Sequence, residues 1–410
     1  MTWFVVVMGL VLLVFLHELG HFSVALAVGM RPRSFYIGFP PAVVKTRRNG
    51  IEYGIGAIPL GGLVRIPGMH RPAARDLQTF ISPAIREDAT LAAPAKRVQR
   101  ALAADDFDGA RAALPELRDA VTGAKLSDSA RRTADRALRE VDDGTGADAY
   151  WRQTTWKRIA VIAAGPLMNI LVAFVIFMIV YATGAPSNNL ASTKVAQVEA
   201  NSPAASAGLQ VGDKVVAVDG KTTPTFDKVR ARIVASHGRP IAVTVDRGGE
   251  RVTLPARATK REGNRYVFGF LPAAQLVSHP IGASARLAAD DCWNVVTGTF
   301  GALGGLVHSK ERGQLTSTVG IVRVSQQALR VDFNYYLQIV GFVSMSLALL
   351  NLLPFLPLDG GHILFSVLEA IRRRAIAREV YERVSVVGFS LIILIFLIAF
   401  SNDLGGHSPG

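Results

Sequence analysis

The chain has 410 residues, enough for two or three domains. Half of them are hydrophobic and the formal net charge is +13, a combination that is unusual for a soluble protein and common for one partly embedded in a membrane. No run of Lys and Arg alternates with aromatic residues, so the charge does not indicate nucleic-acid binding. The single cysteine, Cys292, excludes an intrachain disulfide and a cysteine-rich metal site.

Four apolar stretches are each close to the roughly 20 residues that a helix needs to cross a bilayer. They cover residues 3–30, 159–182, 335–358 and 384–400. The stretch 292–307 is also uncharged, but it is shorter and rich in glycine. We expect it to lie on the membrane surface or to form a re-entrant segment.

The N-terminal stretch contains Ala25-Leu26-Ala27, which resembles a signal-peptidase site. Cleavage is not expected, because no positive charge precedes the stretch and His17, Glu18 and His21 lie within it. Arginines and lysines follow this stretch and also fill the loop between the third and fourth stretches. The positive-inside rule then places both loops in the cytoplasm, and both termini and residues 190–260 outside.

Residues 34–66 alternate like strands, and Asn49-Gly50 favours a two-residue hairpin turn between them. Residues 190–260 have the pattern of a small soluble domain. Its strands are expected at 194–199, 214–218, 241–245 and 251–255, and its helix at 226–235.

Residues 70–150 are rich in Ala, Arg and Asp and have helical periodicity. We expect a cytoplasmic α-helical insertion, built as a helical hairpin or as three helices. Ser127 or Asp128 is expected to cap a helix that ends near Val141. The turns are expected at Gly109, Pro115 and Gly123. Such an insertion would regulate access or bind a cytoplasmic partner without contributing to metal binding, and an inert surface insertion is the alternative.

His17-Glu18-Leu19-Gly20-His21 is an H-E-x-x-H motif. On a helix the two histidines share one face, so both can bind one Zn²⁺. Glu18 lies beside them, where it can take a proton from metal-bound water. Ionisable groups within an apolar span are costly and therefore indicate function.

A catalytic zinc ion usually has three protein ligands and one open position, so a third ligand must come from elsewhere. Asp359 is the leading candidate because it closes the third apolar stretch, and His362 and Glu369 are competing ligands. The structural alternative is that Asp359-Gly360 forms a turn, or that Asp359 caps a helix starting near His362.

These two motifs together resemble the site-2 protease family of intramembrane zinc metalloproteases, in its bacterial PDZ-containing type. That family pairs H-E-x-x-H in its first span with L-D-G in a later span. Further similar stretches are Ile58–Gly62, the G-P-x-x-N element in Ala164–Asn169, and Ser202–Leu209 with Gly212-Asp213. Only residues 70–150 fall outside the resemblance.

The resemblance implies that His17, His21 and Asp359 hold zinc and that Glu18 is the general base. It also implies a group of residues that position substrate, which are Asn351, Pro354, Asn169, Gly61 and Gly62. A polar cap and a kink are the alternative for Asn351 and Pro354, and a buried amide satisfied by a neighbouring helix is the alternative for Asn169.

Residue patterns and resemblance together predict an α-helical integral membrane protein. It has about four transmembrane helices, a membrane-associated β-hairpin, an inserted α-helical segment and an α+β PDZ-like domain. The expected segments are 1–69 (first span and hairpin), 70–150 (insertion), 151–189 (second span), 190–262 (PDZ-like domain), 263–334 (connecting segment) and 335–410 (third and fourth spans).

The expected function is hydrolysis of peptide bonds in single-span membrane proteins of a bacterial plasma membrane, such as an anti-sigma factor or remnant signal peptides. The substrate helix must first become extended, and an edge strand near residues 51–58 is expected to hold it by β-augmentation. A catalytically silent PDZ scaffold would not need the buried charges. A transporter would need polar residues in several spans, and a secreted zinc protease would lose the motif with its signal peptide.

Overall fold

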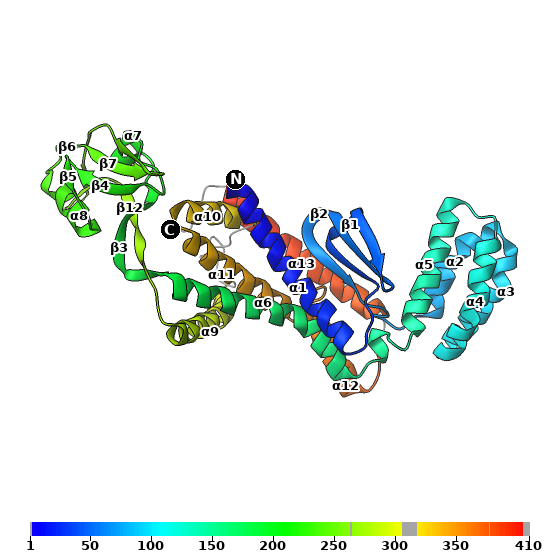
Figure 1. The fold of residues 1–410 in the computed structure, drawn as a ribbon. Helices are drawn as coiled ribbons and strands as arrows, with labels where there is room; N and C mark the ends of the chain where they lie inside the picture. Colours follow the sequence, from blue (N-terminus) through cyan, green and yellow to red (C-terminus); the bar gives the residue numbers. More distant parts are fainter. Residues whose placement is uncertain (1, 263–264, 306–317, 377, 405–410) are drawn as a thin grey trace. The chain divides into compact units, whose positions relative to one another are not determined.

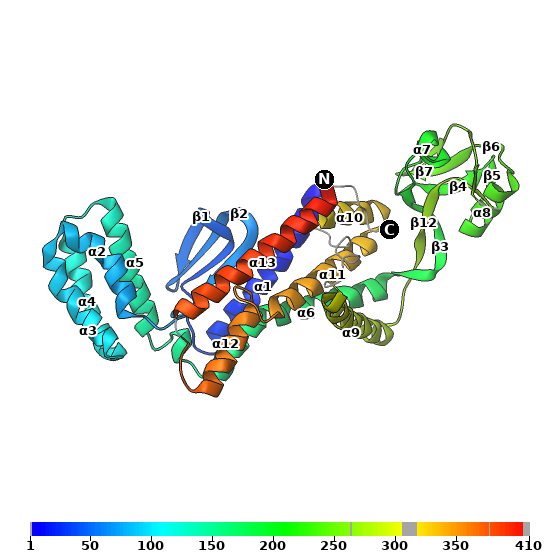
Figure 2. The same cartoon turned by 180° about the vertical axis from the view of Figure 1, so that it is seen from behind.

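The computed structural model describes residues 2–262, 265–305, 318–376 and 378–404. The chain forms two compact units. Unit 1 contains residues 1–10, 169–349 and 393–410, and unit 2 contains residues 11–168 and 350–392. Figures 1 and 2 show the elements of both units from opposite sides.

Four helices of the described chain are long and apolar enough to cross a membrane, as the sequence predicts. They are α1 (Thr2–Ala27), α6 (Thr155–Thr183), α11 (Phe333–Leu352) and α13 (Arg378–Leu404). Large apolar side chains along them are exposed, for example Leu171 on α6 and Val387 on α13, which fits a lipid environment. Helix α11 ends at Leu352 and not at the expected Leu358, because Pro354 disfavours helical geometry in the residue before it.

Three further helices, α9 (Ile281–Gly305), α10 (Thr318–Val331) and α12 (Asp359–Arg372), flank these spans in the sequence. Residues 292–305 continue α9 without a break, so this stretch is part of a longer helix. Its expected place on the membrane surface or in a re-entrant segment stays a prediction. Residues 306 and 307 lie outside the described part of the chain.

Strands β1 (Ser34–Arg48) and β2 (Ile51–Arg65) pair across Asn49-Gly50, as predicted. The φ angles of these two residues are 52° and 81°, which are the positive values that a type I′ turn requires. The distal half of the pair is an ordinary antiparallel ladder between residues 44–48 and 51–55.

The base of the hairpin is more elaborate than the sequence predicts. Residues 34–37 pair with residues 52–55 and also with residues 62–65. Residues 52–55 therefore have a partner on both sides, and the prediction of a free edge strand at 51–58 is wrong for them.

The insertion in unit 2 is helical, as expected, but it has four α-helices and not two or three. They are α2 (Ala74–Glu87), α3 (Ala92–Ala103), α4 (Phe107–Gly123) and α5 (Asp128–Thr145), with a 3₁₀ turn η1 (Ala89–Leu91) between α2 and α3. The Ser127 hydroxyl accepts a hydrogen bond from the backbone N–H of Ala130 at 3.2 Å and so caps α5. This helix runs to Thr145, beyond the expected end at Val141.

The prediction of turns at Gly109 and Pro115 is wrong, because both residues lie inside α4. Asp106 caps this helix through a hydrogen bond from Gly109. The buried face of α4 packs into the core of the four helices through Ala110, Leu114, Leu117 and Val121. Burial of that apolar face outweighs the local cost of a proline in a helix. Gly123 does end α4, as expected.

Unit 1 contains a small α/β domain around one sheet with the strand order β12-β3-β4-β7-β8, in which β5 pairs with β4. These strands are β3 (Ala185–Val198), β4 (Lys214–Val218), β5 (Lys221–Thr222), β7 (Val243–Arg247), β8 (Glu250–Thr253) and β12 (Phe270–Val277). Two further short pairs join β6 (Pro240–Ile241) to β9 (Arg257–Ala258) and β10 (Lys260–Glu262) to β11 (Arg265–Val267). The helices are α7 (Pro203–Ala207) and α8 (Phe226–Ala235), and α8 and β4 have the predicted bounds.

Candidate metal centre

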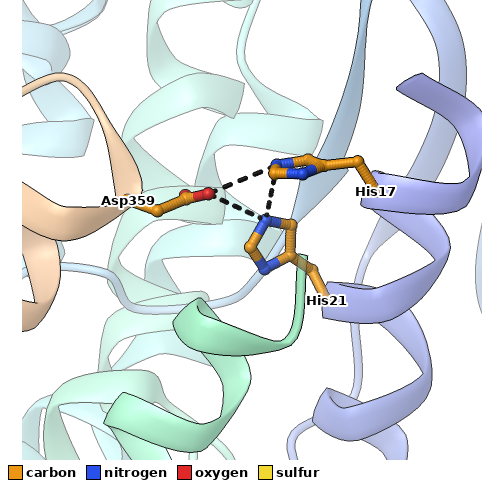
Figure 3. Close-up of side chains that lie close together, drawn as sticks. All are labelled: His17, His21 and Asp359. Carbon is orange, nitrogen blue, oxygen red and sulfur yellow. Dashed lines mark hydrogen bonds and ion pairs between the residues drawn. The ribbon is translucent and has the colours of Figure 1, made fainter. Parts of the chain in front are cut away.

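Helix α1 places His17 and His21 one turn apart on the same face. Their Nε2 atoms lie 3.2 Å apart, and their rings are nearly perpendicular (Figure 3). Both side chains are buried although α1 is otherwise apolar. The helix therefore directs two imidazole nitrogens at a single point.

Asp359, the first residue of α12, completes the group from a distant part of the chain. Its Oδ2 atom lies 3.2 Å from Nε2 of His17 and 3.4 Å from Nε2 of His21 (Figure 3). The turn before α12 packs closely against the two following glycines. A Cβ at Gly360 would overlap the Leu352 and Leu353 carbonyls, and one at Gly361 would lie 2.5 Å from the backbone nitrogen of Leu356. The D-G-G sequence thus fixes where the carboxylate points.

The chemistry of the three side chains fits a zinc ion. Nδ1 of His21 lies 2.8 Å from the carbonyl of Val161, so this nitrogen carries the proton and Nε2 keeps its lone pair. Oδ2 of Asp359 is buried and receives no hydrogen bond. Convergence of such electron-pair donors is unfavourable unless a cation lies among them. Two imidazoles and one carboxylate are a ligand set that Zn²⁺ takes in catalytic sites with one position left open.

Glu18 follows His17 on α1 and lies within electrostatic range of both histidines and Asp359. Its side chain is partly buried, and the backbone of Gly62 in β2 lies against it. A carboxylate so close to the metal-binding group has the placement of a general base.

The competing ligands of the sequence analysis lie elsewhere. Glu369 accepts hydrogen bonds from Arg158 at 2.6 Å and from the backbone N–H of Ile376 at 2.9 Å, so its carboxylate is already engaged. His362 lies outside the group of His17, His21 and Asp359, and its ring stacks on that of Tyr381. Among the described residues, the only group of three or more His, Cys, Asp or Glu with metal-binding spacing is His17, His21 and Asp359.

The residues expected to position substrate belong to several elements of the fold. Asn351 lies in the last turn of α11, and Pro354 is exposed in the turn after it. Gly61 and Gly62 lie in β2 near α1, and a Cβ at Gly61 would touch the ring of Phe39. Asn169 belongs to unit 1, where it is fully buried and its backbone carbonyl accepts a hydrogen bond from Ser344 at 2.8 Å.

Sequence reasoning did not assign the residues of α6 that hold His21. Besides the carbonyl of Val161, Gly165 lies against the His21 ring, where a Cβ would be 2.6 Å from Cε1. Gly165 belongs to the G-P-x-x-N element noted in the sequence. That element does not indicate a contact with a histidine of another helix.

The four long apolar helices and the His-His-Asp group with its adjacent glutamate define a membrane metallohydrolase. The model of peptidase family M50 matches residues 5–395, so the chain belongs to this family, that of the site-2 proteases, and is a zinc metalloprotease.

Three relatives are similar over nearly their whole length. The zinc metalloprotease RasP of Geobacillus kaustophilus is 30% identical and aligns with 98% of this chain and 96% of its own. A zinc metalloprotease candidate of Agrobacterium fabrum is 30% identical, with 97% and 94% covered. The regulator of sigma-W protease RasP of Bacillus subtilis is 28% identical, with 98% and 97% covered.

Proposed function

We propose that this zinc metalloprotease cleaves single-span membrane proteins within or at the edge of the bilayer. The observation that carries the proposal is the convergence of His17, His21 and Asp359 beside Glu18. Two of these ligands and the glutamate lie within α1, a helix apolar and long enough to span a membrane. A site in such a helix can act on substrates that are themselves embedded in lipid.

The roles of the residues follow from their chemistry. His17, His21 and Asp359 would hold Zn²⁺, which supplies polarisation of the substrate carbonyl and a water of lowered pKa. Glu18 accepts a proton from the attacking water and delivers it to the leaving amine. Because these groups are shielded from water, the electrostatic interactions among them are stronger than they would be in solution.

Single substitutions test these assignments in the purified full-length protein. His17→Ala and Asp359→Ala should lose both bound zinc and cleavage of a single-span model protein. Glu18→Gln should retain zinc, because it removes no ligand, and lose at least about 1000-fold in kcat. Full zinc occupancy and turnover in Asp359→Ala would show that the third ligand is another residue.

The proposed substrate class is a membrane regulator such as an anti-sigma factor, or remnant signal peptides. The proposal is supported by the relative named as a regulator of sigma-W protease. Cells that express only the Glu18→Gln variant should accumulate membrane-bound fragments of the natural substrates. Mass spectrometry of those fragments, compared with cells that express the wild-type chain, would identify them.

We further propose that the α/β domain around residues 190–262 is PDZ-like, lies outside the plasma membrane of a bacterium, and filters substrates by size or reads their trimmed ends. Its sheet and two helices support a module of this kind. None of its described residues belongs to the group of His, Cys, Asp or Glu with metal-binding spacing, so a role in the chemistry itself is not proposed.

A further inference from the structure

Glu18 lies on the face of α1 that packs against the β-hairpin. The ring of Phe35 in β1 is 5.8 Å from that of Phe15 and 5.0 Å from that of Phe22. Phe15, Glu18 and Phe22 are spaced by three and four residues, so they share one side of the helix. Val64 of β2 belongs to the same apolar cluster. The hairpin therefore covers α1 at the level of the general base.

One contact joins β2 directly to Glu18. The backbone of Gly62 lies against the side chain, since a Cβ at this position would overlap Cγ of Glu18 and lie 3.1 Å from its Cδ. Only a hydrogen atom fits between the two. The backbone of Gly62 cannot easily move away, because it pairs with Ile37 in the hairpin ladder.

We propose that the β2 backbone at Gly62 is a positioning element for the general base, an assignment that rests on the proposed function of Glu18. A glutamate has three side-chain torsions and adopts many rotamers when it is unrestrained. The close approach of the Gly62 backbone restricts those torsions before substrate binds. Catalysis gains from this because a shift of about 1 Å in a reacting group can lower the rate about 100-fold.

The proposal gives Gly62 a role distinct from contact with substrate. A methyl group at this position cannot be accommodated by the paired backbone, so the Glu18 side chain must move. Neither His17, His21 nor Asp359 is among the three atoms nearest to that methyl group. The expected defect therefore lies in proton transfer, and the metal-binding group is expected to remain intact.

The test compares Gly62→Ala and Gly62→Val with the wild-type full-length protein, using a single-span model protein as substrate. We expect kcat to fall about 100-fold in Gly62→Ala and further in Gly62→Val, with zinc content and KM as in the wild type. Gly298→Ala is the matched control and should behave as wild type, because a Cβ at Gly298 meets open space.

Each result decides the matter. An unchanged kcat, or a rise in KM alone, would overturn the positioning role, and the second result would assign Gly62 to substrate contact. Loss of zinc or of cooperative thermal unfolding would also overturn it and make Gly62 part of the scaffold. Glu18→Gln, assayed in parallel, tests the general base itself, so activity in that variant would refute the proposed function whatever Gly62 does.

Discussion

His21 is held by α6 from two sides. Its Nδ1–H donates a hydrogen bond to the carbonyl of Val161, one turn before Gly165. Gly165 itself lies against the ring, where a Cβ would be 2.6 Å from Cε1 and 2.8 Å from Cδ2. The hydrogen bond selects the tautomer and the glycine fixes the plane of the imidazole. Outer contacts of this kind usually change metal affinity 10- to 100-fold when they are lost.

Gly165→Ala should therefore weaken zinc binding roughly 10- to 100-fold, because the added methyl group pushes the His21 ring away from His17 and Asp359. Competition with a chelator of known affinity measures the effect on the purified protein. Gly123→Ala is a suitable control, since a Cβ there meets open space at the end of α4. Wild-type affinity in Gly165→Ala would mean that the ring adapts without cost.

The sequence predicts which residues bind the metal better than it predicts the neighbouring residues that hold them in position. The spacing of His17 and His21 within a helix is a local property, so the motif alone places them together. The approach of Gly165 to His21 depends on how deeply two helices pack, which no local pattern states. The same holds for Gly20, where a Cβ would overlap the carbonyl of Ala164.

The insertion is joined to the base of the hairpin by an ion-pair network. Asp143 of α5 accepts hydrogen bonds from Arg33 at 2.8 Å and from Arg65 at 2.7 Å. Arg33 also donates to Asp148 at 2.9 Å. Burial alone would lower the pKa of Arg33, but the hydrogen bonds to Asp143 and Asp148 outweigh it and raise the pKa. Because Arg65 directly follows Val64 in β2, the insertion is coupled to the strand that contacts Glu18.

Asp143→Asn should loosen the hairpin base and lower kcat several-fold, with zinc content unchanged. The pair is partly exposed, so we expect a loss of about 1–2 kcal/mol in stability, between the values for exposed and buried ion pairs. Glu116→Gln in the same insertion removes an exposed partner of Arg97 and should have little effect. Thermal unfolding and steady-state kinetics of both variants measure the difference, and equal behaviour of the two would exclude coupling through Asp143.

Helices and strands can be predicted from hydrophobic periodicity wherever one face of the element is buried. Helix α4 persists through Pro115 because four apolar residues of its buried face pack into a shared core, a tertiary effect that local turn signals cannot reveal. The doubled pairing of residues 34–37 in the hairpin is missed for a similar reason. Alternation indicates a strand but does not say which strands become neighbours.

At the scale of the whole molecule, hydropathy predicts the number of spans and charge predicts their direction. Both signals are sums over many residues, so single exceptions matter little. The partnership of Asp359 with His17 and His21 has a different origin, because it joins the two ends of the chain. The L-D-G motif indicated which carboxylate takes part, but the tight turn that aims it becomes visible only in the structure.

The orientation of the chain in the membrane can be tested by labelling single cysteines. In a Cys292→Ser background, cysteine would replace Lys221 in β5 of the α/β domain or Arg139 in α5 of the insertion, and both side chains are exposed. The arginine-rich segments next to α1 and α13 are expected to remain in the cytoplasm. An impermeant maleimide should then label position 221 in intact spheroplasts and position 139 only after lysis. Labelling of position 221 only after lysis would reverse the orientation and place the α/β domain in the cytoplasm. Zinc content and cleavage of the model substrate, measured on the same variants, ensure that the labelled molecules are native.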